Sequence, residues 1–104
     1  MIARVWHGWT TPGNADAYQR LLERDVLPGI LGKGIAGLRS IDVLRREDGD
    51  EVEFMTLMRF ESLDDILGFV GEDAEKAYVP AGARELLAHF EDRAQHYEIR
   101  HTTR

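Results

Sequence analysis

The stretch "RVWHGWTT", residues 4–11, places two tryptophans three positions apart, with a histidine and a glycine between them. Its β-branched and aromatic residues predict a β-strand over residues 2–9, which the breaker "TTPGN" closes. Successive side chains of a strand point to opposite faces of the sheet, so Trp6 and Trp9 lie on different faces. Both faces therefore carry an indole, and neither has the polar pattern of a water-exposed surface.

A later strand has the same two-sided apolar pattern. In "VEFMTLMRF", residues 52–60, alternate residues from Val52 to Phe60 share one face, whereas Met55 and Leu57 lie on the other. An antiparallel sheet with one face in water would carry polar residues there. Something other than the chain's own helices must cover this second face. A second copy of the same sheet is the economical candidate.

A helix is predicted between these strands. Apolar residues recur at helical spacing from Ala15 to Val26, and Pro28 disfavours helical geometry at the residue before it, so the helix should end or kink there. The glycine-rich "GILGKG" leads into a second strand over about residues 35–46. Asp48 and Gly49 then supply residues that tolerate positive φ for a hairpin turn.

The chain after residue 60 is predicted to contain broken helical segments and a final strand. Ser62 and Asp65 are spaced as a capping box, and Gly71 is the expected end of that helix. A further turn or two of helix is expected over residues 73–79, another short helix from residue 80 to about residue 88, and the last strand over residues 93–101.

The resulting order of elements, β-α-β-β-α-β, predicts an α+β fold of the ferredoxin-like type, with a four-stranded antiparallel sheet and helices on one face. A chain of 104 residues suits a single domain spanning residues 1–104. Because helices cover only one face of such a sheet, the apolar second face predicts a homodimer.

Composition excludes several classes of function. Hydrophobic residues make up 43% and charged residues 31% of the chain, as in ordinary globular proteins. The net charge of -6 argues against nucleic-acid binding, which needs a concentrated basic surface. No segment has the apolar length of a membrane span, and "MIARVW" lacks the features of a signal peptide. With no cysteine for disulfides or thiolate chemistry, we expect a cytoplasmic protein.

Three motifs suggest sites that their context does not support. "GKGIAG", residues 32–37, matches a dinucleotide-binding fingerprint, but the predicted helix precedes it and a strand follows, the reverse of what pyrophosphate binding requires. The four histidines include no pair at the helical spacing of a zinc protease, so no metal site is predicted. The acidic "EDGDE" lacks the ligand spacing of an EF-hand and is interpreted as a solvated turn.

Three segments carry a family resemblance. The opening "MIARVWHGWTTPGNADAY", the middle "RREDGDEVEFMTLMRFESLDDILGFVGED" and the ending "RAQHYEI" resemble the antibiotic-biosynthesis monooxygenase family of the dimeric α/β-barrel superfamily. This resemblance spans nearly the whole chain. It implies a homodimer in which two sheets wrap into a barrel, with a pocket in each subunit between sheet and helices. One tryptophan of the first strand would then face the pocket, and the other the partner's sheet.

The resemblance also suggests site residues. Related proteins include cofactor-independent monooxygenases that oxidise aromatic polyketides, and heme-degrading monooxygenases; both use a polar residue, typically asparagine, on the first strand and a tryptophan after the third. Here the tryptophan position corresponds to Phe69 and the asparagine position to Trp6 or His7, with no asparagine on that strand. The axial histidine of the heme-degrading branch would fall near Val79, with Tyr78 the nearest polar ring, so no cofactor is predicted.

Five residues are the candidates for a substrate site. His7 is the candidate catalytic base, since imidazole accepts a proton near neutral pH; an ordinary hydrogen-bonded strand histidine is the alternative. Trp9, on the same face, could stack on a planar substrate, and Phe69 and Tyr78 could close the helix side of the pocket. Arg39 could hold a substrate anion, although strand arginines at a dimer edge more often pair with carboxylates.

These residues support two interpretations. In the first, a small aromatic or polyketide-like substrate is deprotonated in a dry pocket, and its electron-rich anion reacts directly with oxygen, without flavin or metal. In the second, the chain is a non-catalytic dimeric module that binds a small hydrophobic ligand or has a purely structural role. A polar group converging on a sizeable pocket would favour the first, and a pocket plugged by its own tryptophans the second.

Overall fold

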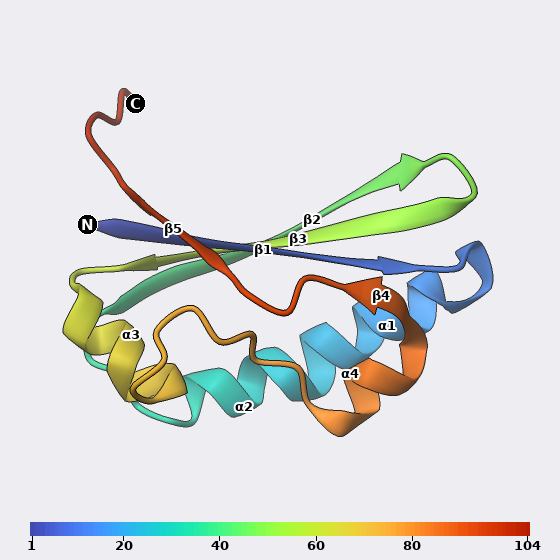
Figure 1. The fold of residues 1–104 in the computed structure, drawn as a ribbon, viewed down its shortest axis with the longest axis horizontal. Coiled ribbons are helices and arrows are strands. Elements are labelled where there is room, and N and C mark those ends of the chain that lie inside the picture. The colour runs from blue at the N-terminus through green and yellow to red at the C-terminus, as the bar shows by residue number, and fades with distance from the viewer.

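The computed structural model describes residues 1–104 as a layer of antiparallel sheet packed on a layer of helices, which confirms the ferredoxin-like α+β fold (Figure 1). The sheet is open, and β2, β3 and β1 lie side by side in that order, with β4 and β5 both paired to the free edge of β1. The strands are β1 (Ile2–Thr10), β2 (Leu38–Asp48), β3 (Glu51–Phe60), β4 (Leu87–Phe90) and β5 (Gln95–Glu98).

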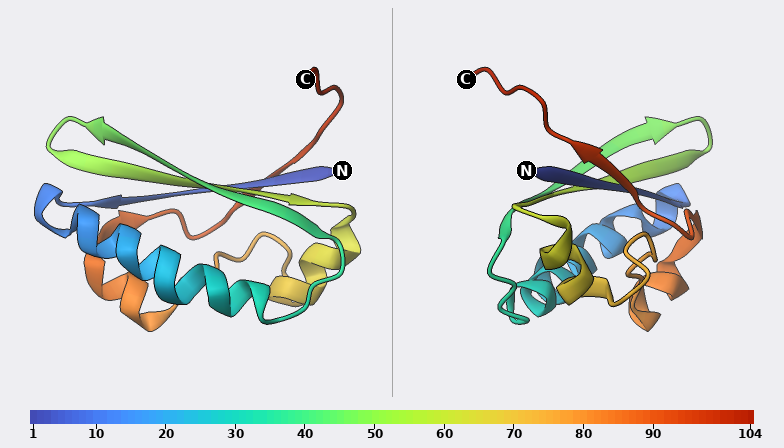
Figure 2. Two further views of the ribbon diagram at one scale, coloured as in Figure 1. Left: turned by 180° about the vertical axis from the view of Figure 1, so that it is seen from behind. Right: turned by 60° about the vertical axis from the view of Figure 1, so that its left-hand side comes forward.

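The helices all lie on one face of this sheet, as both views of Figure 2 show. They are α1 (Ala15–Leu21), α2 (Leu27–Leu31), α3 (Leu63–Val70) and α4 (Ala81–Leu86), with a 3₁₀ turn (Pro12–Asn14) before α1 and a π-helical turn (Leu22–Val26) between α1 and α2. None of them is long and apolar enough to cross a membrane. The other face of the sheet has no cover from the chain itself.

The fourth strand position is divided between two short strands, where the sequence predicted one strand over residues 93–101. β4 pairs with Gly8–Thr10 and β5 with Ile2–Val5. At the break, the Glu91 amide donates to the His7 carbonyl at 3.0 Å, and the Glu91 carbonyl accepts from the Trp6 indole at 2.7 Å. The chain therefore separates from β1 between β4 and β5, while both backbone groups of Glu91 stay hydrogen-bonded to residues of β1.

The first helical region was predicted to end or kink before Pro28, and it does not end there. The π-helical turn carries the helix past residue 26, and the chain stays helical to Leu31. Pro28 falls in the first turn of α2, the part of a helix that tolerates a proline best. The wider turn before it thus absorbs a residue that would break a regular α-helix.

Local signals in the second half of the chain were partly correct. The Gly49 φ of +61° confirms the hairpin turn, and the Ser62 side chain accepts from the Asp65 amide at 3.4 Å, as a capping residue should. Gly71, at φ +90°, ends α3. The predicted helix over residues 73–79 is wrong, because this segment runs irregularly and is joined by an isolated bridge between Lys76 and Arg93.

Alternation along β1 separates two environments. Arg4, Trp6 and Thr10 are buried on the helix side, where they join a core that includes a perpendicular Tyr18–Phe54 pair with ring centroids 4.8 Å apart. The face without helices, called the open face from here on, carries half-buried and exposed side chains of mixed character. They come from alternate positions of every strand: Val5, His7, Trp9, Leu44, Met55, Leu57, His89 and Tyr97.

Candidate functional site

An apolar cavity lies between the sheet and the helices, as the family resemblance implied. It has a volume of about 40 Å³, and twelve of its fifteen lining residues are hydrophobic. Four aromatic rings, one arginine and one threonine are part of the wall: Trp6, Tyr18, Phe69, Tyr78, Arg4 and Thr56. A volume of roughly 10–15 Å³ holds one water molecule, so the cavity has room for a few waters.

A second, more open depression adjoins this cavity. It has a volume of about 270 Å³ and shares Val26, Tyr78, Pro80 and Ala83 with the inner cavity as common lining. Tyr78 is 37% exposed and packs on Phe69, with ring centroids 5.0 Å apart. We call the two spaces the inner cavity and the outer groove. The Tyr78 ring is part of the wall between them.

Arg4 is the one charged residue that lines the inner cavity, and only 3% of it is exposed. Its guanidinium donates to the carbonyls of Ala74 and Lys76, both at 2.6 Å, and lies over the Phe69 ring at 5.6 Å. Burial lowers the Arg4 pKa to about 10, which still leaves the group a cation at neutral pH. The irregular segment after α3 is thus attached to β1 through a buried positive charge.

His96 on β5 is the neighbour of Arg4 across the sheet. Its Nε2 lies 2.8 Å from an Arg4 guanidinium nitrogen, and the two residues are register partners in the β1–β5 pair. Burial, and then the positive charge of Arg4, lower the His96 pKa below its ordinary value. A neutral imidazole can accept the Arg4 hydrogen bond, whereas imidazolium could not.

Burial also governs the tyrosine on α1. Tyr18 is 1% exposed, and burial raises its pKa well above the ordinary value for a phenol. It is therefore a neutral wall residue. Neither Tyr18 nor Arg4 is a ready proton acceptor, so the inner cavity holds no strong base of its own.

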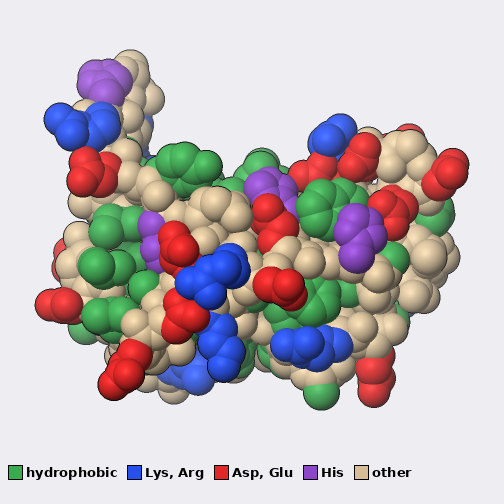
Figure 3. Space-filling model, viewed as in Figure 1, with side chains coloured by type: hydrophobic (Ala, Val, Ile, Leu, Met, Phe, Trp, Pro, Cys, Tyr) green, Lys and Arg blue, Asp and Glu red, His purple; other side chains and the backbone are tan.

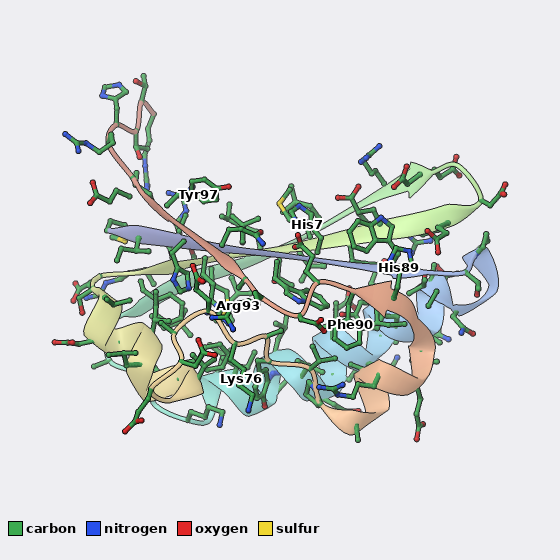
Figure 4. All side chains as sticks on the ribbon, viewed as in Figure 1. His7, Lys76, His89, Phe90, Arg93 and Tyr97 are labelled. Atoms are coloured by element: carbon green, nitrogen blue, oxygen red, sulfur yellow. The ribbon has the colours of Figure 1, made fainter.

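His7 and Trp9 do not line the inner cavity, because their side chains lie on the open face; Figure 4 shows His7 on the side of β1 away from the helices. The His7 Nδ1 is 2.6 Å from a Glu91 carboxylate oxygen, and its Nε2 is 3.8 Å from Glu53. Trp9 stacks on His89 with ring centroids 4.6 Å apart. The catalytic role predicted for His7 stays a prediction, and it would require a substrate on the open face.

Of the other predicted residues, two line the inner cavity and one does not. Phe69 and Tyr78 are in its wall, whereas Arg39 lies on the exposed side of β2 and pairs with Glu61. Sequence reasoning missed Arg4 and did not select His96 as a site residue. Strand alternation already placed Arg4 on the face of Trp6, and a charged residue on an otherwise apolar face was the signal available.

Many of the charged side chains elsewhere take part in ion pairs or in small networks of opposite charge. Figure 3 shows acidic and basic groups interspersed over the face in view, and Arg93 is paired with both Asp73 and Glu75. No group of three or more His, Asp or Glu side chains is arranged to hold a metal ion. The inner cavity is thus a largely apolar space with a buried charged group in its wall.

Solved structures resemble the chain throughout its length. A candidate antibiotic biosynthesis monooxygenase from Bacillus cereus matches 99% of this chain and 96% of its own, with a TM-score of 0.68 and 13% identity. The Mycobacterium tuberculosis protein Rv0793 matches 99% of this chain and 98% of its own, with a TM-score of 0.63 and 18% identity. The chain has their fold.

No protein-family model matches the sequence, and no curated protein matches it either. The structural likeness confirms the ferredoxin-like fold. At such low identity, residue roles must come from the chain's own geometry.

Proposed function

We propose that the chain belongs to the antibiotic-biosynthesis monooxygenase family and acts as a cofactor-independent monooxygenase on a small aromatic or polyketide-like substrate. The observation that carries the proposal is the inner cavity, in which four aromatic rings surround a space with one buried cation. Aromatic walls suit a planar substrate, and a cation stabilises the anion that such chemistry requires.

The reaction can be written without a cofactor. A substrate with an acidic C–H group, such as an anthrone, loses a proton and becomes an electron-rich carbanion or enolate. This anion gives one electron to O₂, and the radical pair joins as a peroxide at the same carbon. The peroxide anion takes a proton back from solvent and then loses water to leave a ketone, so one CH₂ group and one O₂ become one C=O group and one H₂O.

The residues of the inner cavity would contribute by binding and by electrostatics. Phe69 and Tyr78 would hold the ring, and the Arg4 cation would lower the pKa of the bound substrate. Because no strong base lines the cavity, solvent would remove the proton as the substrate enters. The bound substrate and the apolar wall around it would then keep water from protonating the anion.

The alternative is a non-catalytic module that binds a small hydrophobic ligand or has a purely structural role, and the small size of the cavity favours it. Ligand sites are typically about 300–1,000 Å³, and the inner cavity has about 40 Å³. A substrate with more than one ring needs Tyr78 to move so that the inner cavity joins the outer groove. A non-catalytic module would bind only a ligand small enough to fit the space that this movement of Tyr78 opens.

We infer that the working unit is a homodimer, which is the arrangement implied by the family resemblance. The open face exposes Leu44 by 44% and Tyr97 by 58%, beside half-buried Val5 and Leu57. A second open face laid against it would bury these side chains and complete the barrel. The inner cavity lies on the other side of the sheet, so each subunit would keep its own.

Oxygen uptake with an anthrone, measured with metals chelated, tests the proposed activity. We expect one O₂ consumed for each quinone formed, and turnover that falls at least tenfold in Phe69→Ala, which removes a cavity wall. His7→Ala is the informative comparison, because general-base assistance is typically worth about a hundredfold or more. Unchanged turnover in His7→Ala would favour chemistry in the inner cavity over chemistry at His7. If no aromatic substrate causes oxygen uptake, the non-catalytic alternative is the one that remains.

A further inference from the structure

The geometry points to a ligand that binds in the inner cavity as an anion, with a carboxylate or phenolate oxygen on the Arg4 guanidinium. This inference deepens the proposed function and rests on it where the ligand is the substrate. It concerns the charge class of the ligand and does not require that the ligand be oxidised.

Arg4 is buried without a counter-ion. A guanidinium has five N–H groups, and three contacts hold Arg4: the carbonyls of Ala74 and Lys76, and the His96 ring. Glu75 attracts Arg4 electrostatically but forms no ion pair with it, and the Glu75 carboxylate lies 3.5 Å from Arg93. The three contacts use both N–H groups of Nη1 and one of Nη2, so two of the five N–H groups of Arg4 have no partner in the protein.

The surroundings of Arg4 do not neutralise its positive charge, which favours the binding of an anion beside it. Taking a cation out of water costs several kcal/mol unless a partner compensates it, and two carbonyls and a neutral imidazole carry no full negative charge. The Trp6, Tyr18 and Phe69 rings that line the same space are apolar. An anionic oxygen in the inner cavity would supply the missing charge.

A purely structural role for Arg4 explains the carbonyl contacts but not its place in the wall of the cavity. Arg84 performs such a role nearby, since its Nε donates to the Val79 carbonyl at 3.0 Å from an exposed position. Arg4 reaches the same segment from inside the molecule, and its carbonyl contacts fix the guanidinium before any ligand arrives. A fixed donor loses less entropy on binding, which is how pre-formed sites gain affinity.

The two spaces together fit an aromatic acid. The inner cavity, at about 40 Å³, has room for a carboxylate and the edge of a ring, and the outer groove continues past Tyr78. The charged group of the ligand would therefore lie deepest in the cavity, at Arg4, and its ring would lie between Phe69 and Tyr78. Displacement of the Tyr78 ring, which is the shared wall, would open the way.

Calorimetric titration with benzoate and benzamide at pH 7.5 tests the inference, because the two probes have the same shape and differ in charge. We expect the wild type to bind benzoate at least about tenfold more tightly, the scale of one hydrogen bond to a charged group. Arg4→Met should abolish this preference, and Arg84→Met should keep it. In the wild type, benzoate should also shift the NMR signal of the indole N–H of Trp6, a residue that lines the cavity.

Equal affinity for the two probes in the wild type overturns the inference, as does a preference that persists in Arg4→Met. If Arg4→Met does not fold, the wild-type ratio and the Trp6 signal decide, and Arg4→Lys should keep a preference for benzoate. Failure of the proposed function has a different signature: benzoate binds at Arg4, yet no aromatic substrate consumes oxygen. Equal turnover of neutral and anionic substrates would instead support the proposed oxygenase activity and contradict the proposed anion site.

Discussion

Replacing Gly8 with alanine should both destabilise the protein and narrow the inner cavity. Gly8 lies on β1, two residues from Trp6 and on the same face. A Cβ atom at this position would lie 2.7 Å from the Trp6 Cη2 and 3.0 Å from the Leu87 Cδ2. Carbon atoms prefer separations of about 3.5–4.0 Å, so the indole must move by several tenths of an ångström or more.

The indole has little freedom to move. Trp6 is 7% exposed and its Nε1 donates to the Glu91 carbonyl at 2.7 Å, so a shift either strains this hydrogen bond or pushes the ring toward the inner cavity. Overpacking of a core costs about 1–3 kcal/mol, and we expect the free energy of unfolding to fall by that amount. Each kcal/mol lowers the melting temperature of a domain of this size by roughly 4–8 °C.

Urea denaturation followed by circular dichroism measures the loss, with all variants at one protein concentration because a dimer's stability depends on it. Gly68→Ala is the matched control: no atom lies within 4 Å of its added Cβ, and alanine in the middle of α3 should raise stability by up to about 1 kcal/mol. Gly8→Ala with wild-type stability and wild-type benzoate affinity would refute the packing argument for Trp6.

Three further predictions concern the dimer, pH and heme. Leu57→Arg, on the open face, should halve the mass seen by light scattering from about twice the chain mass of 11.9 kDa, whereas Asp64→Arg on α3 should not; a wild-type monomer would contradict the barrel. The His96 pKa is lowered in the folded protein, so its contribution to stability is full above about pH 6.5 and is lost as the pH falls below that; His96→Gln should flatten this decline in urea titrations at pH 7.5 and 5, and an unchanged decline would assign it elsewhere. Hemin should give no sharp stoichiometric complex in the Soret band, because the expected axial position is near Val79 and the cavity of about 40 Å³ is far smaller than a porphyrin. A saturable 1:1 complex would contradict the prediction that the chain binds no heme.

Periodic and capping signals in the sequence predicted most of the fold. The alternation in residues 2–9 and 52–60, the turn at Gly49 and the capping box at Ser62 each act through neighbouring residues, so they are visible locally. The order of these elements was enough to identify the ferredoxin-like topology, which the structure confirms.

The features that were missed depend on distant parts of the chain. Whether Pro28 ends a helix depends on the π-helical turn before it, and the break between β4 and β5 depends on Glu91 binding back to β1. For the site, alternation showed that Trp6 and His7 lie on opposite faces, but not which face the helices cover. The packing of the helices decides which face they cover. Phe69 and Tyr78 therefore line the inner cavity, whereas His7 and Trp9 lie on the open face.

The division of the sheet edge has a consequence for motion. β5 has four residues that pair only with Ile2–Val5, and β4 is attached separately, so β5 can detach without unfolding β4. Such local unfolding needs less free energy than global unfolding, and it would carry His96 away from Arg4 and let water reach the guanidinium. The charged end of the inner cavity is thus sealed by one of the shortest strands of the sheet, and amide hydrogens there should exchange with solvent before those of β3.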